Sequence, residues 1–324
     1  MSVRCLYLRG RACIGLALVF YWLGAPASMA GEVREAFVTN QIGDSLSVVD
    51  LASLKAIAEV KIGGKPAGIA MSADGREAYL AAPDSKEVVV VDAETRQVTR
   101  RFKVGEGPLG IAANPVGGTV YVADWYEHAL LVLDPTTGEI KARIGTGKSP
   151  SGVAVSRDGK LILTADRDSN EVSLIDAGTN TRLGSISVGE RPFGVTIDAL
   201  AQRAYTANVK SDDVSVIDLA TRKLIATVKV GHRPYAVALA KGRAFVTDQY
   251  GGTVSVIDLG TMTVVKTITV GDYPEGIMAD RAEAFIYVAC WDANTLEKID
   301  TTTLEVAGKA EVGQGPRAFG AFLR

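Results

Sequence analysis

A Gly-x-x-Pro element recurs along the chain at a nearly constant spacing. Its prolines are Pro66, Pro108, Pro150, Pro192, Pro234, Pro274 and Pro316. Successive prolines are 42 residues apart, except for a spacing of 40 between Pro234 and Pro274. Such regularity indicates one supersecondary unit repeated in tandem. Each unit in such a protein buries its apolar face against its neighbours.

Each unit contains four short segments with the composition of strands. An apolar run after the proline (residues 68–72) leads through a turn to a second run, exemplified in the next unit by residues 120–123. The third run is rich in valine (residues 87–91), and the fourth alternates between apolar and polar residues (residues 225–230). No segment has a helical period, so these runs are predicted to be strands. Four strands per period of about 42 residues are typical of a β-propeller blade.

The ends of the chain complete the pattern. Three predicted strands precede the first Gly-x-x-Pro element (residues 36–40, 46–50 and 57–62), and one follows the last (residues 318–323). Three strands plus one make a blade, so we predict an all-β, seven-bladed β-propeller domain over residues 31–324. The N- and C-terminal strands would pair in one blade and close the ring, leaving only short protected edges.

The first thirty residues have the layout of a secretory signal peptide. Arg4, Arg9 and Arg11 precede an apolar run over residues 12–23, and residues 27–30 read Ala-Ser-Met-Ala. Small residues at positions −3 and −1 predict cleavage after Ala30. The apolar run is shorter than the roughly 20 residues that a membrane span needs. We therefore expect a periplasmic protein with no integral membrane segment after cleavage.

Removal of residues 1–30 changes the charge and the cysteine content. The whole chain carries 35 Lys and Arg against 37 Asp and Glu, a net charge of −2, and the loss of three arginines makes it −5. Nucleic-acid-binding domains normally carry a basic excess, so this charge argues against a nucleic-acid partner. Only Cys290 of the three cysteines remains, which excludes an internal disulfide.

The repeated strands resemble a known family. Second strands read AFVTN (residues 36–40), VYVAD (120–124), AYTAN (204–208) and AFVTD (244–248). Third strands end in SVVD (47–50) or SVID (215–218 and 255–258). The chain is similar to YVTN-repeat β-propellers over residues 32–324. The resemblance implies the propeller fold. Members of the family differ in what they bind, and some resemble accessory factors of periplasmic quinone-dependent or cytochrome-linked oxidation systems.

Seven aspartates end the third strands and might suggest a ring of cation sites. They are Asp50, Asp92, Asp134, Asp176, Asp218, Asp258 and Asp300, each followed three positions later by Ser or Thr. We interpret these segments as Asx turns, in which the carboxylate binds its own backbone. A feature present in every blade belongs to the scaffold, and a functional site is expected where the pattern breaks.

The pattern breaks in two columns of loop residues that should open on one face of the ring. One column surrounds the Gly-x-x-Pro prolines and the other follows the second strands. Trp, Tyr and Arg, which dominate binding hot spots, gather in both columns. We predict that the ligand- or partner-binding residues at this channel mouth are Trp125, Tyr126, Arg167, Arg191, Phe193, Lys210, His232, Arg233, Tyr235, Gln249, Tyr250, Trp291, Asp292 and Arg317. The alternative is that some of these aromatic residues plug the channel and pack against their own blades.

The sequence predicts no catalytic residue, metal site or cofactor. His128 and His232 are about three blades apart, and the aspartates beside them should cap their own loops. Cys290 has no histidine in its blade to act as a base, and no Cys-x-x-Cys-His haem signature occurs.

We therefore expect a monomeric, non-catalytic binding or scaffold protein that engages a protein partner or a small anionic ligand. A propeller-type lyase or lactonase acting at the same mouth is the alternative. Single-stranded nucleic-acid binding is a third interpretation, which the net charge of the mature chain disfavours.

Overall fold

The computed structural model describes residues 1–2, 34–198 and 202–324. The chain divides into two units, Met1–Glu32 and Val33–Arg324. The predicted signal peptide, residues 1–30, belongs to the first unit and lies outside the described residues, apart from Met1 and Ser2. In the described part of the chain, no helix is long and apolar enough to cross a bilayer.

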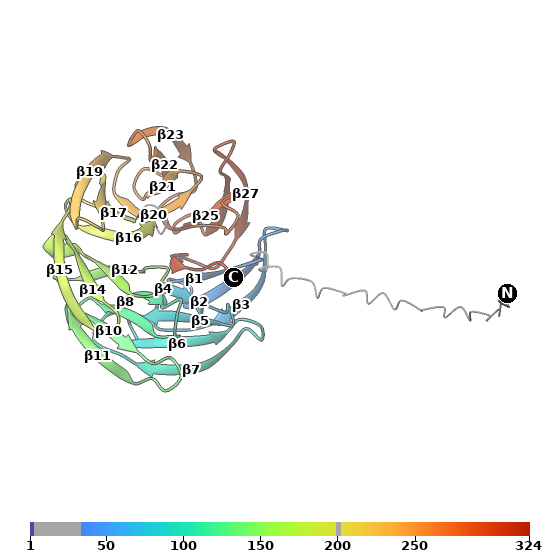
Figure 1. Cartoon of the computed structure of the whole chain (residues 1–324). Helices are drawn as coiled ribbons and strands as arrows, with labels where there is room; N and C mark the ends of the chain where they lie inside the picture. The colour runs from blue at the N-terminus through green and yellow to red at the C-terminus, as the bar shows by residue number, and fades with distance from the viewer. Residues whose placement is uncertain (3–33, 199–201) are drawn as a thin grey trace. The chain divides into compact units, whose positions relative to one another are not determined.

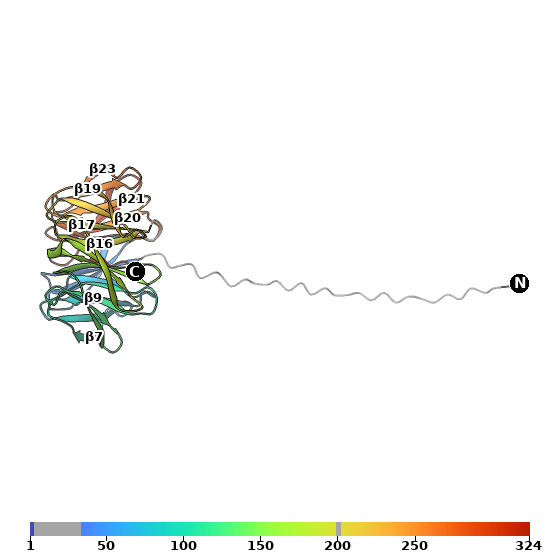
Figure 2. The same ribbon diagram turned by 60° about the vertical axis from the view of Figure 1, so that its left-hand side comes forward.

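The second unit is an all-β propeller whose seven sheets follow one another around a ring (Figures 1 and 2). Blades 1 to 3 are built as follows: β1 (Glu35–Asn40), β2 (Ser45–Asp50) and β3 (Lys55–Lys61); β4 (Gly68–Met71), β5 (Glu77–Ala82), β6 (Glu87–Asp92) and β7 (Gln97–Lys103); β8 (Pro108–Ala113), β9 (Val120–Asp124), β10 (Ala129–Leu133) and β11 (Ile140–Gly145).

The remaining blades repeat the same order, with a single 3-10 turn, η1 (Arg167–Ser169), among the described residues. Blades 4 to 7 are β12 (Pro150–Val155), β13 (Leu161–Asp166), β14 (Glu171–Asp176) and β15 (Thr181–Ser187); β16 (Pro192–Asp198), β17 (Arg203–Asn208), β18 (Asp213–Asp218) and β19 (Lys223–Lys229); β20 (Pro234–Ala240), β21 (Arg243–Asp248), β22 (Thr253–Asp258) and β23 (Thr263–Thr269); β24 (Pro274–Ala279), β25 (Phe285–Cys290), β26 (Thr295–Asp300) and β27 (Glu305–Glu311).

The blades share one internal design. Strands are antiparallel, and the second and third strands are almost entirely buried, whereas the outer fourth strands are largely exposed. In every blade a bulge interrupts the pairing of third and fourth strands just before the terminal aspartate, as between Val90 and Val91. The predicted Asx turns are confirmed, because each aspartate accepts a hydrogen bond from the backbone N–H three residues later. The two residues missing from blade 6 are lost in the β20–β21 turn, where only Lys241 and Gly242 separate the strands.

The predicted closure of the ring is confirmed, with a difference in the last strand. The C-terminal segment, red in Figure 1, lies beside β1 and forms bridges between Ala36 and Leu323 and between Asn40 and Pro316. The regular strand β28 (Phe319–Ala321) is shorter than predicted and pairs in parallel with β4 of blade 2. The C-terminal segment therefore pairs with strands of both blade 1 and blade 2.

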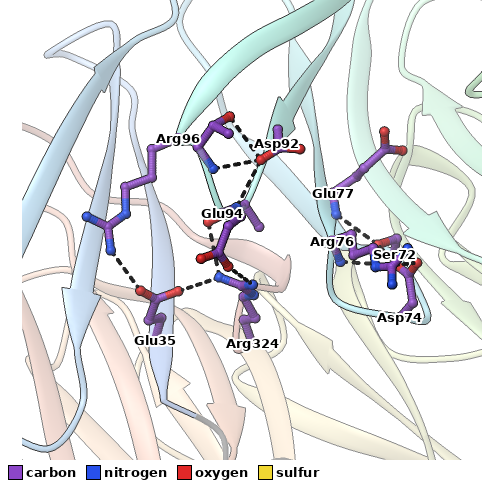
Figure 3. A network of polar contacts seen from close by, with 11 residues as sticks. Glu35, Ser72, Asp74, Arg76, Glu77, Asp92, Glu94, Arg96 and Arg324 are labelled. Carbon is purple, nitrogen blue, oxygen red and sulfur yellow. Dashed lines mark hydrogen bonds and ion pairs between the residues drawn. The ribbon is translucent and has the colours of Figure 1, made fainter.

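Ion pairs around Arg324 reinforce this closure (Figure 3). Its guanidinium lies 2.9 Å from Glu35 at the start of β1 and 2.8 Å from Glu94 in the turn after β6. Glu35 also pairs with Arg96 at 3.0 Å. Glu35 is largely buried, so these pairs are screened less by solvent than ordinary surface pairs.

The inner strands approach each other closely at a ring of glycines. A Cβ atom added to Gly110 would lie 1.8 Å from the carbonyl oxygen of Ser151 in the next blade. The corresponding distances are 2.1 Å at Gly68, 2.5 Å at Gly152 and 2.7 Å at Gly194. In five of the seven repeats the residue two positions after the proline is a glycine, required by packing between blades rather than by its φ angle. Ala236 and Ala318 take this position after Pro234 and Pro316.

We predict that Gly110→Ala destabilises the protein by about 1–3 kcal/mol, the usual cost of overpacking a filled site. The matched control is Gly145→Ala, where an added Cβ meets nothing within 4 Å and φ is not left-handed. Urea unfolding of both variants measures the difference. Equal midpoints for the two variants would contradict the packing argument.

Candidate functional site

A small pocket of about 210 Å³ opens at the mouth where the two variable loop columns meet. Its lining residues are Trp125, Arg167, Phe193, Val209, Arg233, Tyr235, Gln249 and Arg317. Seven of these eight belong to the fourteen residues predicted from the sequence. The structure thus brings half of the predicted set into one cavity.

The repeat itself explains why these side chains converge. Four of them, Trp125, Arg167, Val209 and Gln249, are the first residues after the second strands β9, β13, β17 and β21. The other four, Phe193, Arg233, Tyr235 and Arg317, stand directly before or after a Gly-x-x-Pro proline. A backbone hydrogen bond joins the two columns in each of these blades, as from Gln249 N–H to the Arg233 carbonyl at 3.0 Å.

Buried polar side chains at the ends of the second strands hold these loops. Asp124 accepts hydrogen bonds from four backbone N–H groups, two from each of the loops that meet beside it. Asn208 donates to Asp213 and Ser215 at 2.7 and 2.9 Å. These residues are fully buried, so they position the loops and are not part of the accessible surface.

The backbone just before the prolines is left-handed in most blades. Arg191 and Arg233 have φ angles of 57° and 58°, and Lys65, Ser149 and Tyr273 adopt the same conformation. A positive φ is uncommon for residues other than glycine. Because it recurs around the ring, here it is a property of the scaffold that displays the side chains and not a sign of local function.

Three arginines make the pocket and its rim strongly positive. Arg167 extends over the ring of Trp125, with 5.4 Å between the guanidinium carbon and the ring centroid. Burial lowers the pKa of Arg167, and the charges of Arg191 and Arg233 lower it further, against the opposing effect of Asp168. The Arg191 side chain has no ion pair or hydrogen bond to any residue that the structure describes. The guanidinium of Arg233 donates a hydrogen bond to Tyr250 Oη and lies over the Tyr250 ring.

A fourth arginine is neutralised in the wall of the pocket. Arg317 lies 2.8 Å from the buried carboxylate of Glu275 and donates hydrogen bonds to Tyr235 Oη and, at 3.1 Å, to Gln41 Oε1. Gln249 Nε2 donates to the other oxygen of Glu275 at 2.6 Å. Burial raises the pKa of Glu275, while the charge of Arg317 opposes that rise. The network fixes the wall and contributes little net charge to the cavity.

Three aromatic rings separate the pocket from the central channel. Phe193 lies 4.3 Å from Tyr235 and 5.1 Å from Phe319, measured between ring centroids. Beyond these rings an apolar cavity of about 430 Å³ is lined by inner-strand residues such as Met71 and Ile277. The alternative reading of the sequence, that aromatic residues plug the mouth, thus applies to Phe193 and Tyr235, which also form the pocket floor.

The other predicted residues lie on or near the rim, outside the pocket lining. Tyr126 is 70% exposed, Lys210 pairs with Glu190 at 2.6 Å, and His232 Nδ1 lies 3.0 Å from Asp212. Trp291 packs 6.3 Å from Tyr273, and Asp292 is exposed beside it. Arg191 lies close enough to Arg167 to lower its pKa, and Tyr250 accepts a hydrogen bond from Arg233.

Sequence reasoning missed two participants, Val209 and Glu275. Val209 stands at the same loop position as Trp125 and Arg167, so its place in the repeat could have revealed it. Glu275 directly follows Pro274 as Arg317 follows Pro316, in adjacent blades. Because these two positions are equivalent and carry opposite charges, the repeat pattern could have predicted that Glu275 and Arg317 pair.

The remaining reactive side chains are held in local contacts. His128 Nδ1 accepts a hydrogen bond from the Ser149 N–H at 3.0 Å, and His232 belongs to another blade. Cys290 is fully buried, and burial raises the pKa of its thiol well above the usual range. Within residues 34–198 and 202–324, no three His, Cys, Asp or Glu side chains come together to hold a metal ion.

Comparisons with known proteins support the propeller fold. A family model described as YNCE-like beta-propeller matches residues 21–117, which supports a β-propeller family. The match covers less than half of the chain, so the YVTN-repeat resemblance stays a prediction. No curated protein matches the chain in sequence.

Solved structures are similar over most of the ring. Hydrazine Synthase from Kuenenia stuttgartiensis has 20% identity and a TM-score of 0.69, covering 78% of this chain and 88% of that one. A functionally unknown protein from Desulfotomaculum acetoxidans has 15% identity and a TM-score of 0.74, covering 88% and 99%. Dihydro-heme d1 dehydrogenase NirN, in complex with DHE, has 19% identity and a TM-score of 0.62; it covers 88% of this chain, which spans 64% of that one. At these identities the likeness shows the fold alone.

We predict a pH-dependent effect at Asp248, the residue before Gln249. Burial, partly offset by hydrogen bonds from Ser255 and Thr253, raises its pKa to about 6. The native state therefore binds this proton more tightly than the unfolded state, so ionisation of Asp248 costs stability above pH 6 and the cost fades at lower pH. Asp248→Asn removes that cost, and Asn208 shows that an amide can make the same contact to a serine.

The unfolding free energy of Asp248→Asn relative to wild type should therefore be more favourable at pH 8 than at pH 5. Urea titrations of both proteins at the two pH values measure this difference. A difference that is constant, or that grows toward pH 5, would show that Asp248 is not destabilised by its charge.

Proposed function

We propose that this protein is an exported, non-catalytic binding protein that captures an anionic group at the pocket. The observation that carries the proposal is the excess of positive charge from Arg167 and Arg233 in the lining of one cavity and from Arg191 near Arg167. Among the described residues, only Arg167 of these three has an ion-pair partner, Asp168 at 2.8 Å. An anion between these side chains would relieve their mutual repulsion and take up their free donors.

The chemistry of the lining favours binding over proton transfer. The ionisable groups that line the cavity are arginines and Tyr235, whose pKa burial raises far above its usual range. A guanidinium group stays protonated in proteins, whereas a general acid or base works best with a pKa near the operating pH. A lyase or lactonase would need such a group at this mouth.

Two further lines of support bear on location and setting. The sequence of residues 1–30 supports export to the periplasm. The family resemblance supports an accessory role in a periplasmic oxidation system, and two of the similar structures are a hydrazine synthase and a dihydro-heme dehydrogenase. That support is an analogy at the level of fold. The experiment that tests the proposal therefore measures anion binding at the pocket.

The test is thermal unfolding of the purified protein with inorganic phosphate, acetate or phenylacetate, each compared with chloride at equal ionic strength. A ligand that binds only the native state raises Tm as its concentration exceeds Kd. We expect at least one of these anions to raise Tm. We expect that rise to be abolished in the double variant Arg167→Gln/Arg233→Gln.

Arg76→Gln is the matched control, because the Arg76 side chain is 83% exposed in a turn of blade 2, away from the pocket residues. It should keep the full response to the anion. No response of the wild-type protein to any of the three anions, or an equal response in the double variant, would overturn the proposed function.

A further inference from the structure

We propose that the ligand of this pocket is a small aromatic carboxylate, with its carboxylate at Arg167 and Arg233 and its ring against Trp125, Phe193 and Val209. This inference rests on the proposed function and names the chemical class of the anion. It follows from a lining that combines guanidinium groups with apolar and aromatic side chains, and from the size of the cavity.

The charged side offers donors suited to a carboxylate. Nη1 of Arg167 donates to Asp168 at 2.8 Å, which leaves its Nε and Nη2 without a hydrogen bond to any described residue. Arg233 uses Nη1 for Tyr250. Because the planar guanidinium presents paired N–H groups, it matches the two oxygens of a carboxylate. The unpaired Arg191 adds charge beside them.

The rest of the lining is apolar and aromatic. The rings of Trp125 and Phe193 lie 6.5 Å apart at an angle of 50°, and Val209 completes this wall. A hydrated inorganic anion would leave these surfaces without apolar contact. A ligand ring placed here could pack at the tilted or edge-to-face angles that aromatic pairs prefer.

The volume and the charge of the pocket further restrict the class of ligand. A volume of about 210 Å³ lies below the roughly 300–1,000 Å³ of pockets for drug-sized ligands, so one ring with a short acidic arm is the natural occupant. An α-amino acid is disfavoured, because its ammonium group would face arginines. The nearby carboxylate of Glu275 is already bound by Arg317 and Gln249.

The experiment compares four probes by isothermal titration calorimetry: phenylacetate, 2-phenylethanol, acetate and inorganic phosphate. Phenylacetate has an aromatic ring and a carboxylate, 2-phenylethanol has the ring without the charge, and acetate has the carboxylate without the ring. We expect phenylacetate to bind at least tenfold more tightly than each of the other three. Arg167→Lys, which keeps the charge but loses the planar fork, should weaken phenylacetate binding about tenfold.

Trp125→Leu tests the aromatic wall and should reduce the preference for phenylacetate over acetate. Tyr273→Leu is its control, because Tyr273 is a half-exposed aromatic residue on the same face that does not line the pocket. The preference should be unchanged in Tyr273→Leu. If Trp125→Leu fails to fold, the ratio of phenylacetate to acetate affinity in the wild-type protein decides the question.

The outcomes separate this inference from the proposed function. If phosphate or acetate binds as tightly as phenylacetate and binding is lost in Arg167→Gln/Arg233→Gln, the pocket is an anion site and the aromatic class is wrong. If 2-phenylethanol binds as tightly as phenylacetate, the carboxylate is not recognised and the inference fails. If none of the anions binds, both proposals fail.

Discussion

Close contact between neighbouring inner strands is the constraint on which the structure depends. At Gly68, Gly110, Gly152 and Gly194, the backbone lies so near the next blade that a Cβ would overlap a carbonyl group. This contact fixes how tightly successive blades pack around the axis. It also determines the width of the channel and the position of its mouth. Ala236 and Ala318 stand at the corresponding position after Pro234 and Pro316, so the scaffold tolerates two exceptions.

The mouth shows how a rigid repeat can carry a single asymmetric site. The same backbone hydrogen bond joins the two loop columns in every blade except blade 2, where Pro83 has no N–H to donate. Buried Asp or Asn side chains end the second strands of five blades. What differs between blades is the side chain displayed on this common frame. Blades 3 to 6 and the closing segment supply arginines and aromatic rings, and the pocket forms only there. The site is thus a local variation that leaves the fold unchanged.

The fold could be predicted almost completely from the sequence, whereas the site could be predicted only in part. Strand order and closure follow from the proline spacing, because pairing within a blade is local. For the site, position mattered more than residue type. The first residue after a second strand reaches the pocket in blades 3 to 6, whereas the second residue, such as Tyr126 or Lys210, points to solvent. The Glu275–Arg317 pair joins two blades. A periodic pattern does not show which long side chains meet at the channel mouth.

Closure through the C-terminal segment also has a consequence for the order of folding. Strands β1 to β3 are made first, yet their blade lacks its inner strand until residues 316–324 have been made. Glu35 and Arg324, which meet in the closing network, are separated by 289 positions. Forming so distant a contact carries a large loop-closure cost and slows folding. Until then, the edges of β1 and β4 remain available to other chains. The assembly of this ring is therefore a late, single event, and the protein is most vulnerable to aggregation just before it.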